Sequence, residues 1–227
     1  TGEIDIGPTV LTLLPIFQKL FKSVGEDIFE HIDLVRQKII ARHWWPDGTS
    51  LDLYDDFETS RDAIMKFSGS GSAIEFEKYF HDTRDLFSCF DLPVMQNPRP
   101  SMLDMNLAVL SNPKILSKLH PLRTLSSLLN YKFQDKRLRQ LFGRYATYVG
   151  GSPLESPALL SLVWQAETQG VWSIKGGMRK LARVIEQLAK ARGASFNYGT
   201  DIKEFNTKDD RVVSITDTFE KKYEADK

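Results

Sequence analysis

The sequence predicts an α/β protein (α+β in its overall composition) in which a layer of strands, glycine turns and helices is interrupted by a large, mostly helical insertion. A short apolar stretch leads into Gly7-Pro8 near the start of the chain, and another, residues 171–174, leads into Gly176-Gly177. Glycine has no Cβ, so it lets backbone lie close against a flat ligand. The residues between these two edges have mostly helical periodicity, which indicates an insertion into a split cofactor-binding floor.

The composition allows a large buried core and excludes several classes of protein. Of the 227 residues 41% are apolar, and the formal net charge is zero, which argues against a general nucleic-acid binder. The single cysteine, Cys89, excludes an internal disulfide and fits a reducing compartment, and we expect it to be a small buried side chain. No run of 18 uninterrupted apolar residues occurs, so the sequence predicts no membrane-spanning helix.

Two features predict that the chain is the middle part of an enzyme. No Gly-x-Gly-x-x-Gly fingerprint follows a predicted strand. The chain also begins with Thr1 and ends at Lys227 without a capping element. We therefore expect truncation at both ends.

A strand and a helix are predicted before residue 26. Residues 3–6 have the pattern of a short strand that turns at Gly7-Pro8. Thr12 is a plausible helix cap, Pro15 suits the first turn, and Gly25 ends the helix. Residues 26–33 predict a further helical turn.

A β-hairpin is predicted next. Residues 35–43 and 50–54 have strand patterns on either side of Pro46-Asp47-Gly48, which is a strong turn signal. Trp44 and Trp45 lie next to this turn, and we interpret them as wall or core residues. A ligand-stacking role for them is the alternative.

Helical periodicity recurs through the middle of the chain. The predicted helices span residues 57–67, 72–90, 103–110, 113–129, 134–147 and 158–167. The first two are separated by Gly69-Ser70-Gly71-Ser72, which no strand precedes and no lysine follows, so a helix connection is favoured over a phosphate loop.

The last 60 residues have a different pattern. The strand at 171–174 and Gly176-Gly177 lead into a helix with apolar residues from Met178 onward, and residues 194–198 predict the next strand. This is the crossover from which doubly wound nucleotide folds are built. Residues 201–206 and 211–216 add a predicted meander.

Several motifs resemble those of the flavin-dependent carotenoid desaturases, the phytoene desaturase family within the amine oxidase superfamily. In chain order they are Asp5-x-Gly7-Pro8-Thr9-Val10, Tyr148-Val149-Gly150-Gly151-Ser152-Pro153, Ser156-Pro157-Ala158-Leu159-Leu160, Gln169-Gly170-Val171-Trp172 and Gly176-Gly177-Met178. The motifs after residue 147 most resemble the 1-hydroxycarotenoid 3,4-desaturases, also called methoxyneurosporene dehydrogenases. The resemblance extends patchily over nearly the whole chain and is densest at 143–205.

The resemblance implies a Rossmann-like domain that binds flavin adenine dinucleotide (FAD) and holds an inserted substrate domain. Residues 1–25 and 170–227 would be parts of the FAD-binding domain, and residues 26–169 the inserted domain with its hairpin near 35–54. The family's first glycine-rich unit would lie upstream of Thr1 and its last flavin segment downstream of Lys227.

The implied chemistry is hydride abstraction from a C–C bond of a linear hydroxylated or methoxylated carotenoid, with proton loss from the neighbouring carbon. By the resemblance, the residues that would contact the cofactor are Gly7, Pro8, Thr9, Gly176, Gly177 and Ile202. Those assigned to the hydrophobic polyene substrate are Trp44, Trp172 and Met178. No acid or base is nominated, and the scattered residues His31, His43, His81 and His120 have no metal-ligand spacing.

Other readings stay open at this point. A flavin amine oxidase, or a saturase or isomerase acting on polyenes, has the same superfamily fold. A protein of a different class, a non-catalytic lipid-binding module that has lost its nucleotide site, would retain the cavity. The parent gene's sequence just upstream would separate these classes.

The segment 111–144 predicts a membrane contact. It is rich in leucine, and its eight bases face one acid, Asp135. If Pro121 only kinks the helix, the leucines share one broad face. We therefore expect a cytoplasmic protein that docks on the inner face of the plasma membrane; a core helix with solvated bases is the alternative.

Overall fold

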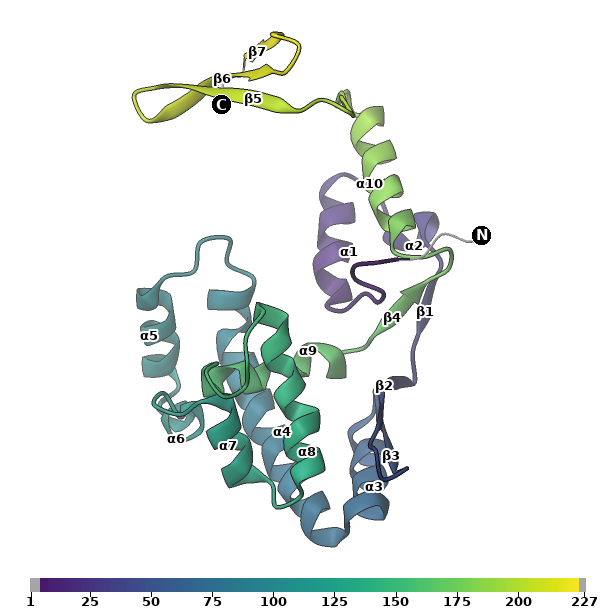
Figure 1. Cartoon of the computed structure of the whole chain (residues 1–227), viewed down its shortest axis with the longest axis vertical. Coiled ribbons are helices and arrows are strands. Elements are labelled where there is room, and N and C mark those ends of the chain that lie inside the picture. The colour runs from purple at the N-terminus through teal and green to yellow at the C-terminus, as the bar shows by residue number, and fades with distance from the viewer. Residues whose placement is uncertain (1–4, 225–227) are drawn as a thin grey trace. The chain divides into compact units, whose positions relative to one another are not determined.

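The computed structural model describes residues 5–224 and divides into two compact units, one running to Leu181 and the other from Ala182 onward (Figure 1). Both units contain helices and strands, which confirms the predicted α/β class. The first unit begins with α1 (Leu14–Ser23), α2 (Ile28–His31), β1 (Leu34–Arg36), β2 (Ile39–Trp44), β3 (Ser50–Tyr54), α3 (Phe57–Ser68) and α4 (Ser70–Phe90).

The rest of the first unit consists mostly of short helices. They are η1 (Asp91–Met95), α5 (Met102–Ser111), η2 (Pro113–Ile115), α6 (Leu116–Leu119), α7 (Leu125–Lys132), α8 (Lys136–Gly143), η3 (Arg144–Val149), η4 (Ala158–Leu162) and α9 (Gln165–Thr168). The strand β4 (Trp172–Ile174) follows, and α10 (Arg179–Ala191) begins in the first unit and continues into the second. The second unit also holds β5 (Ile202–Lys208), β6 (Arg211–Asp217) and β7 (Lys222–Glu224).

An aromatic cluster forms the main core of the first unit. Tyr79 of α4 and Phe142 of α8 are fully buried, with ring centres 4.7 Å apart, and Trp164 lies 5.4 Å from Phe142. The indole nitrogen of Trp164 donates to Thr83 Oγ1 at 2.9 Å, so the polar edge of this buried ring is satisfied. Leu53 of β3 joins the same cluster, which fixes the hairpin on α3 and α4.

The strand predicted at 35–43 is wrong as a single strand. The chain changes partners at Gln37 and Lys38: the amide of Gln37 donates to Val171 O at 2.8 Å, whereas Lys38 O accepts from Asp55. β1 therefore pairs antiparallel with β4, and β2 pairs with β3 in the predicted hairpin. Pairing with a strand whose partner residues lie 136–140 positions later in the chain overrides the local pattern.

Several predicted helix boundaries are also corrected. Leu13 has a left-handed backbone (φ 51°), so α1 begins after it and Thr12 is not its cap. The predicted helix 113–129 is broken at His120 (φ 43°) and Pro121, since proline cannot continue a helix there. Gly69 alone connects α3 to α4, which confirms a helix connection at the Gly-Ser patch.

In the second unit the meander is confirmed, but the strand predicted at 194–198 is wrong. β5 pairs with β6 and β6 with β7, all antiparallel. Residues 194–198 have no strand partner among the described residues. Instead Phe196 and Tyr198 stack at 6.0 Å, with Lys190 Nζ 5.4 Å from the Phe196 ring centre, so both rings pack back toward α10.

Candidate functional site

The two glycine-marked segments lie side by side in the first unit. Leu11 and Trp172 exchange reciprocal backbone hydrogen bonds, each 2.8 Å long. Close by, the carboxylate of Asp5 accepts a hydrogen bond from the amide of Met178 at 2.8 Å. The segment Asp5–Leu11 is thus held along the turn from β4 into α10, although 173 positions separate Asp5 from Met178.

The strand predicted at 3–6 is not the element that makes this contact. Residues 3 and 4 lie outside the described residues, and Ile6 is almost completely exposed, in a bend. Leu11 makes the pairing instead, through a single bridge to Trp172. The expected meeting of the two segments is found, but five residues further along the chain.

The Gly176-Gly177 turn depends on glycine. Both residues have positive φ, 93° and 84°, where side chains are strained. A Cβ on Gly177 would also lie 2.8 Å from Asp5 Oδ2. Asp5 therefore occupies the space that a side chain at Gly177 would need, and its negative charge lies beside the N-terminal end of α10, which favours anions.

Trp172 is held from two sides. Its indole covers Gly170, where a Cβ would lie 2.3 Å from the ring carbon Cη2. The guanidinium carbon of Arg36, on the neighbouring strand β1, lies 5.8 Å from the ring centre. Trp172 therefore has a fixed place at the end of the Leu11 bridge.

Of the other predicted site residues, Gly7, Pro8 and Thr9 lie near this meeting point, whereas Trp44 and Ile202 lie on other elements. Gly7, Pro8 and Thr9 lie in the exposed segment between Asp5 and Leu11, and a Cβ on Gly7 would meet nothing within 4 Å. Trp44 lies at the end of β2, opposite Ser50, is 71% exposed, and takes part in neither of the two contacts that join the segments. Ile202 opens β5 in the second unit, opposite Asp217.

A buried polar network lies just before Gly170 and was not predicted. Glu167 on α9 has an 8% exposed side chain, and its Oε2 accepts from Arg144 Nη2 at 2.8 Å and from the Tyr145 hydroxyl at 2.6 Å. Its Oε1 accepts from the Tyr148 hydroxyl at 2.7 Å. The backbone oxygen of Glu167 accepts from the amide of Gly170 at 3.0 Å, which links the network to the turn under Trp172.

The electrostatics of this network keep its phenols protonated. Burial and the hydrogen bond to Glu167 raise the pKa of Tyr148 to about 12, and burial and the charge of Glu167 raise the pKa of Tyr145 well above its usual value. Burial and the positive charge of Arg144 lower the pKa of His43. The only sequence signal for the network was that Tyr148 begins a family-like motif.

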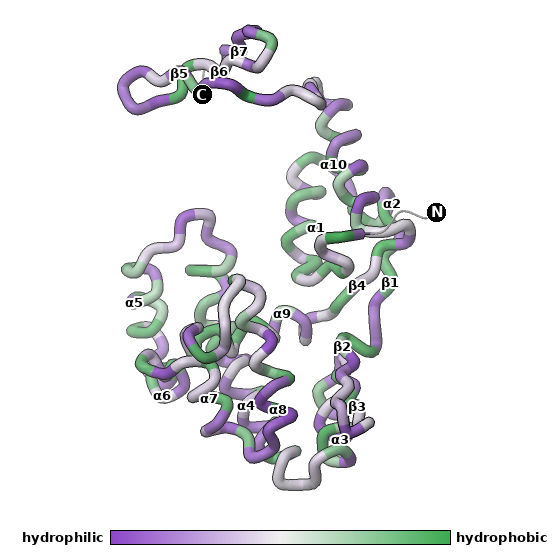
Figure 2. The backbone as a smooth tube through the Cα atoms, viewed as in Figure 1, coloured by the Kyte–Doolittle hydropathy of each residue, from purple (hydrophilic) through white to green (hydrophobic). Residues whose placement is uncertain are grey.

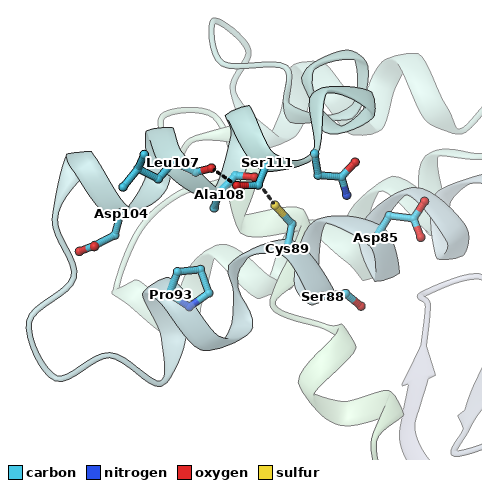
Figure 3. Close-up of a pocket in the computed structure, with 9 residues that line it drawn as sticks. Asp85, Ser88, Cys89, Pro93, Asp104, Leu107, Ala108 and Ser111 are labelled. Atoms are coloured by element: carbon cyan, nitrogen blue, oxygen red, sulfur yellow. Dashed lines mark hydrogen bonds between the residues drawn. The ribbon is translucent and has the colours of Figure 1, made fainter.

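A cavity of about 560 Å³ lies between α4 and α5, and none of the predicted site residues lines it (Figure 3). Cys89 lines it, partly buried, with Sγ 3.5 Å from Ala108 O, and burial raises the pKa of its thiol. The cavity also borders Leu107 and Asp104 of α5. Across residues 5–224, no three His, Cys, Asp or Glu side chains form a metal-binding group, and no helix is long and apolar enough to cross a bilayer.

Replacement of Gly177 by alanine should lower the free energy of unfolding by about 1–2 kcal/mol, because the new side chain needs an unfavourable backbone and meets Asp5. Gly7→Ala is the matched control; its backbone is unstrained and its surroundings are open, so its effect should stay within about 0.5 kcal/mol. Urea unfolding of both variants measures the difference. Equal losses would contradict the proposed role of the turn.

Replacement of Glu167 by glutamine should cost more than about 2 kcal/mol of stability, because it leaves the Arg144 guanidinium without a counter-charge in a largely buried position. Tyr148→Phe removes one half-exposed hydrogen bond and should cost about 1 kcal/mol. Thermal and urea unfolding would rank the two variants. A smaller loss for Glu167→Gln than for Tyr148→Phe would show that the carboxylate does not organise the network.

The sequence is similar to curated carotenoid enzymes over most of its length. It is 42% identical over 214 residues to a hydroxyneurosporene desaturase of Rhodobacter capsulatus and 36% identical over 218 residues to one of Rubrivivax gelatinosus. A 4,4'-diaponeurosporene oxygenase of Staphylococcus aureus is 29% identical over 231 residues. These matches cover 93–94% of this chain but only 41–43% of each relative, so the chain spans less than half the length of the relatives it matches.

The fold is also found in a solved structure. A mutant putrescine oxidase from a redesign of cofactor binding matches 98% of this chain and 45% of its own, with a TM-score of 0.59 and 12% sequence identity, a likeness that concerns the fold alone. No family model matches the chain. The resemblance that the motifs indicated is nevertheless confirmed by the relatives: over 94% of its length this chain is related to the hydroxyneurosporene desaturases.

Proposed function

We propose that the chain is part of an FAD-dependent oxidoreductase that desaturates C–C bonds of a linear, hydroxylated or methoxylated carotenoid. The observation that carries this proposal is the 36–42% identity to hydroxyneurosporene desaturases, joined to the meeting of the Asp5–Leu11 and Gly176-Gly177 segments. Oxygenases that resemble the chain are less similar, at 25–29% identity. Desaturation is therefore favoured over oxygenation.

The residues at the meeting point suit a flat cofactor. The backbone of Gly7, Pro8 and Thr9 is exposed, and Gly7 has open space where a side chain would be. Gly176 is exposed as well, in the positive-φ turn beside them. We assign Gly7–Thr9 and Gly176-Gly177 to the flavin ring and Ile202 to the adenine end, as the family resemblance implies.

Bound FAD would supply the acceptor for the hydride that leaves one carbon of the polyene, while the neighbouring carbon loses a proton. The contribution of this chain is orientation and exclusion of water. Trp172 and Met178 border the same turn and offer apolar surface for a polyene, and Asp5 fixes the amide of Met178. We retain Trp44 as a substrate contact of the complete protein; in the structure its side chain is exposed at the end of β2.

A flavin amine oxidase, a polyene saturase or isomerase, and a non-catalytic lipid-binding module are the competing functions. The likeness to a putrescine oxidase concerns fold and does not favour amine oxidation.

A hydrophobic polyene is collected from lipid rather than from water, so we include docking on the inner face of the plasma membrane in the proposal. The segment 111–144, however, does not form the single face that the sequence predicted.

Two structural facts correct the membrane-binding face that was predicted for residues 111–144. Leu125, Leu128 and Leu129 are buried in the core instead of lying on an exposed face. Many of the bases also have partners from other elements: Lys118 and Lys132 bind Asp82 of α4, at 3.1 and 2.6 Å. The acids that neutralise these bases, Asp82 and Asp85, lie outside the segment, between 33 and 50 positions before the lysines they pair with. Counting charges within the segment therefore overestimated its positive charge.

The intact protein should carry non-covalent FAD and convert a hydroxylated acyclic carotenoid to a product with one more conjugated double bond. Flavin absorption of the purified protein tests the first part, and a shift of the carotenoid bands to longer wavelength tests the second. A primary amine and a carotenoid hydrocarbon serve as comparison substrates. Turnover of the amine without any change in the carotenoids would favour the amine oxidase alternative, and a protein that cannot be loaded with flavin would contradict the proposal.

A further inference from the structure

A second cavity, of about 410 Å³, lies between α7, α8 and the loop that follows η3. Leu129 of α7, Gly143 of α8 and Pro153 of the loop give it apolar walls. Its volume falls in the range of small-molecule sites, which are mostly apolar and hold a few fixed polar groups. The alternation of hydrophobic and hydrophilic positions along α8 can be followed in Figure 2. We call this space the α7–α8 cavity.

The loop wall of the α7–α8 cavity is the family-like motif at 148–153, which has no part in the proposed flavin edge. A Cβ on Gly151 would lie 2.4 Å from Ser156 Oγ, so a side chain there would displace the serine hydroxyl. The backbone oxygen of Pro153 accepts from the amide of Ser126 of α7 at 2.7 Å. The motif is thus fixed against α7 as one side of the cavity.

Arg144 supplies a polar group to the α7–α8 cavity. Its Nη2 donates to Glu167 and to the Tyr145 hydroxyl, and its guanidinium carbon lies 4.3 Å from the centre of the Tyr145 ring, so the group is held in place. Its Nε is buried and has no hydrogen-bond partner among the described residues. A buried donor left unpaired is costly, so this N–H suits an acceptor that a ligand brings.

The charge around Arg144 favours a neutral acceptor over an anion. The Glu167 carboxylate lies 2.8 Å from Arg144 Nη2 and neutralises the guanidinium. In Arg139, which also lines the cavity, each of the three side-chain nitrogens already donates to an oxygen within residues 130–134. A hydroxyl or ether oxygen can accept from Arg144 Nε without adding charge, whereas a carboxylate or phosphate would be repelled by the nearby Glu167.

We propose that the α7–α8 cavity receives the oxygenated end of the linear carotenoid, and that Arg144 Nε donates to its hydroxyl or methoxy oxygen. A linear carotenoid is far longer than this cavity, so only one end enters and the polyene extends out of it. A site that donates to the oxygen discriminates against the hydrocarbon, because the buried N–H then stays unpaired.

Glu167 connects this site to the proposed flavin edge. Its carboxylate binds Arg144, and its backbone oxygen accepts from the amide of Gly170 at 3.0 Å. The carotenoid as the source of the end group rests on the proposed function. The preference of the cavity for a neutral oxygen on an apolar chain rests on the geometry of Arg144 alone.

Binding of acyclic isoprenoid probes to the intact protein tests the site without any turnover. The probes are an alcohol, its methyl ether, the parent hydrocarbon and the corresponding carboxylic acid, all of equal chain length, and calorimetric titration gives their dissociation constants. Arg144→Lys keeps a positive charge beside Glu167 but places a carbon where Nε was. It should weaken binding of the alcohol and the ether about tenfold or more, and binding of the hydrocarbon less than about twofold.

A second variant tests the cavity by filling it. Ser126 lines the cavity and is partly buried, and Ser126→Leu should weaken binding of the alcohol, the ether and the hydrocarbon about tenfold. Ser127→Leu makes the same change at an exposed position that does not line the cavity. Arg137→Lys changes an arginine of α8 that also pairs with a carboxylate, Asp135, but lies outside the cavity lining.

Both controls should bind every probe as the unchanged protein does, and circular dichroism should confirm that the variants are folded. The site would be overturned if no probe binds, if the acid binds more tightly than the alcohol, or if Arg144→Lys weakens alcohol and hydrocarbon equally. Unchanged binding in Ser126→Leu would overturn it as well, even if Arg144→Lys fails to fold.

Activity separates failure of this site from failure of the proposed function. If Arg144→Lys selectively weakens the alcohol and the ether but the unchanged protein desaturates no carotenoid, only the proposed function is contradicted. If the protein desaturates carotenoids and Arg144→Lys leaves its preference for the hydroxylated carotenoid over the hydrocarbon unchanged, only the site is contradicted.

Discussion

The reciprocal backbone bonds between Leu11 and Trp172 join the two halves of the candidate site. Each bond is an ordinary amide–carbonyl pair of 2.8 Å, yet together they fix the beginning of the described chain against a segment more than 150 residues later. The Asp5 carboxylate extends this attachment to the amide of Met178. These contacts together give Gly7–Thr9 and Gly176-Gly177 the fixed relation that the proposed cofactor edge requires.

The bridge is supported from the inserted region by a buried charge. Glu167 accepts hydrogen bonds from one arginine and two tyrosines, and its backbone holds Gly170, on which the Trp172 indole rests. A buried carboxylate of this kind is costly to desolvate and is tolerated because its oxygen atoms are well satisfied. The network therefore connects the helical core to the proposed flavin edge through a short, rigid path.

The sequence predicted the features that depend on local pattern. Apolar spacing and turn residues located α3, α4 and the β2–β3 hairpin, because these elements are stabilised largely by neighbours close in the chain. The family motifs correctly indicated that the Gly7 and Gly177 segments meet. Asp5 lies in one of these motifs, but its hydrogen-bond partner Met178 is 173 positions away, so no spacing rule could predict that the two residues bond.

Features that depend on distant partners could not be predicted. Residues 35–43 have the pattern of one strand, but the first part pairs with β4 and the second part pairs with β3. The bases of 111–144 looked like a charged face, but acids of α4 neutralise Lys118 and Lys132, and Leu125, Leu128 and Leu129 are buried in the core. The domain boundaries and the roles of Trp44 and Ile202 stay predictions for the same reason, since they depend on contacts across the complete protein.

Amide hydrogen exchange at Leu11, Trp172 and Met178 tests the central claim most directly. If the two segments form one edge, the three amides should be protected together and should exchange through a common opening, although they lie far apart in the sequence. Asp5→Ala should then speed exchange at Met178 far more than at Leu11 or Trp172. Exchange of the Leu11 amide at the rate of an exposed loop, independent of Trp172, would contradict the account.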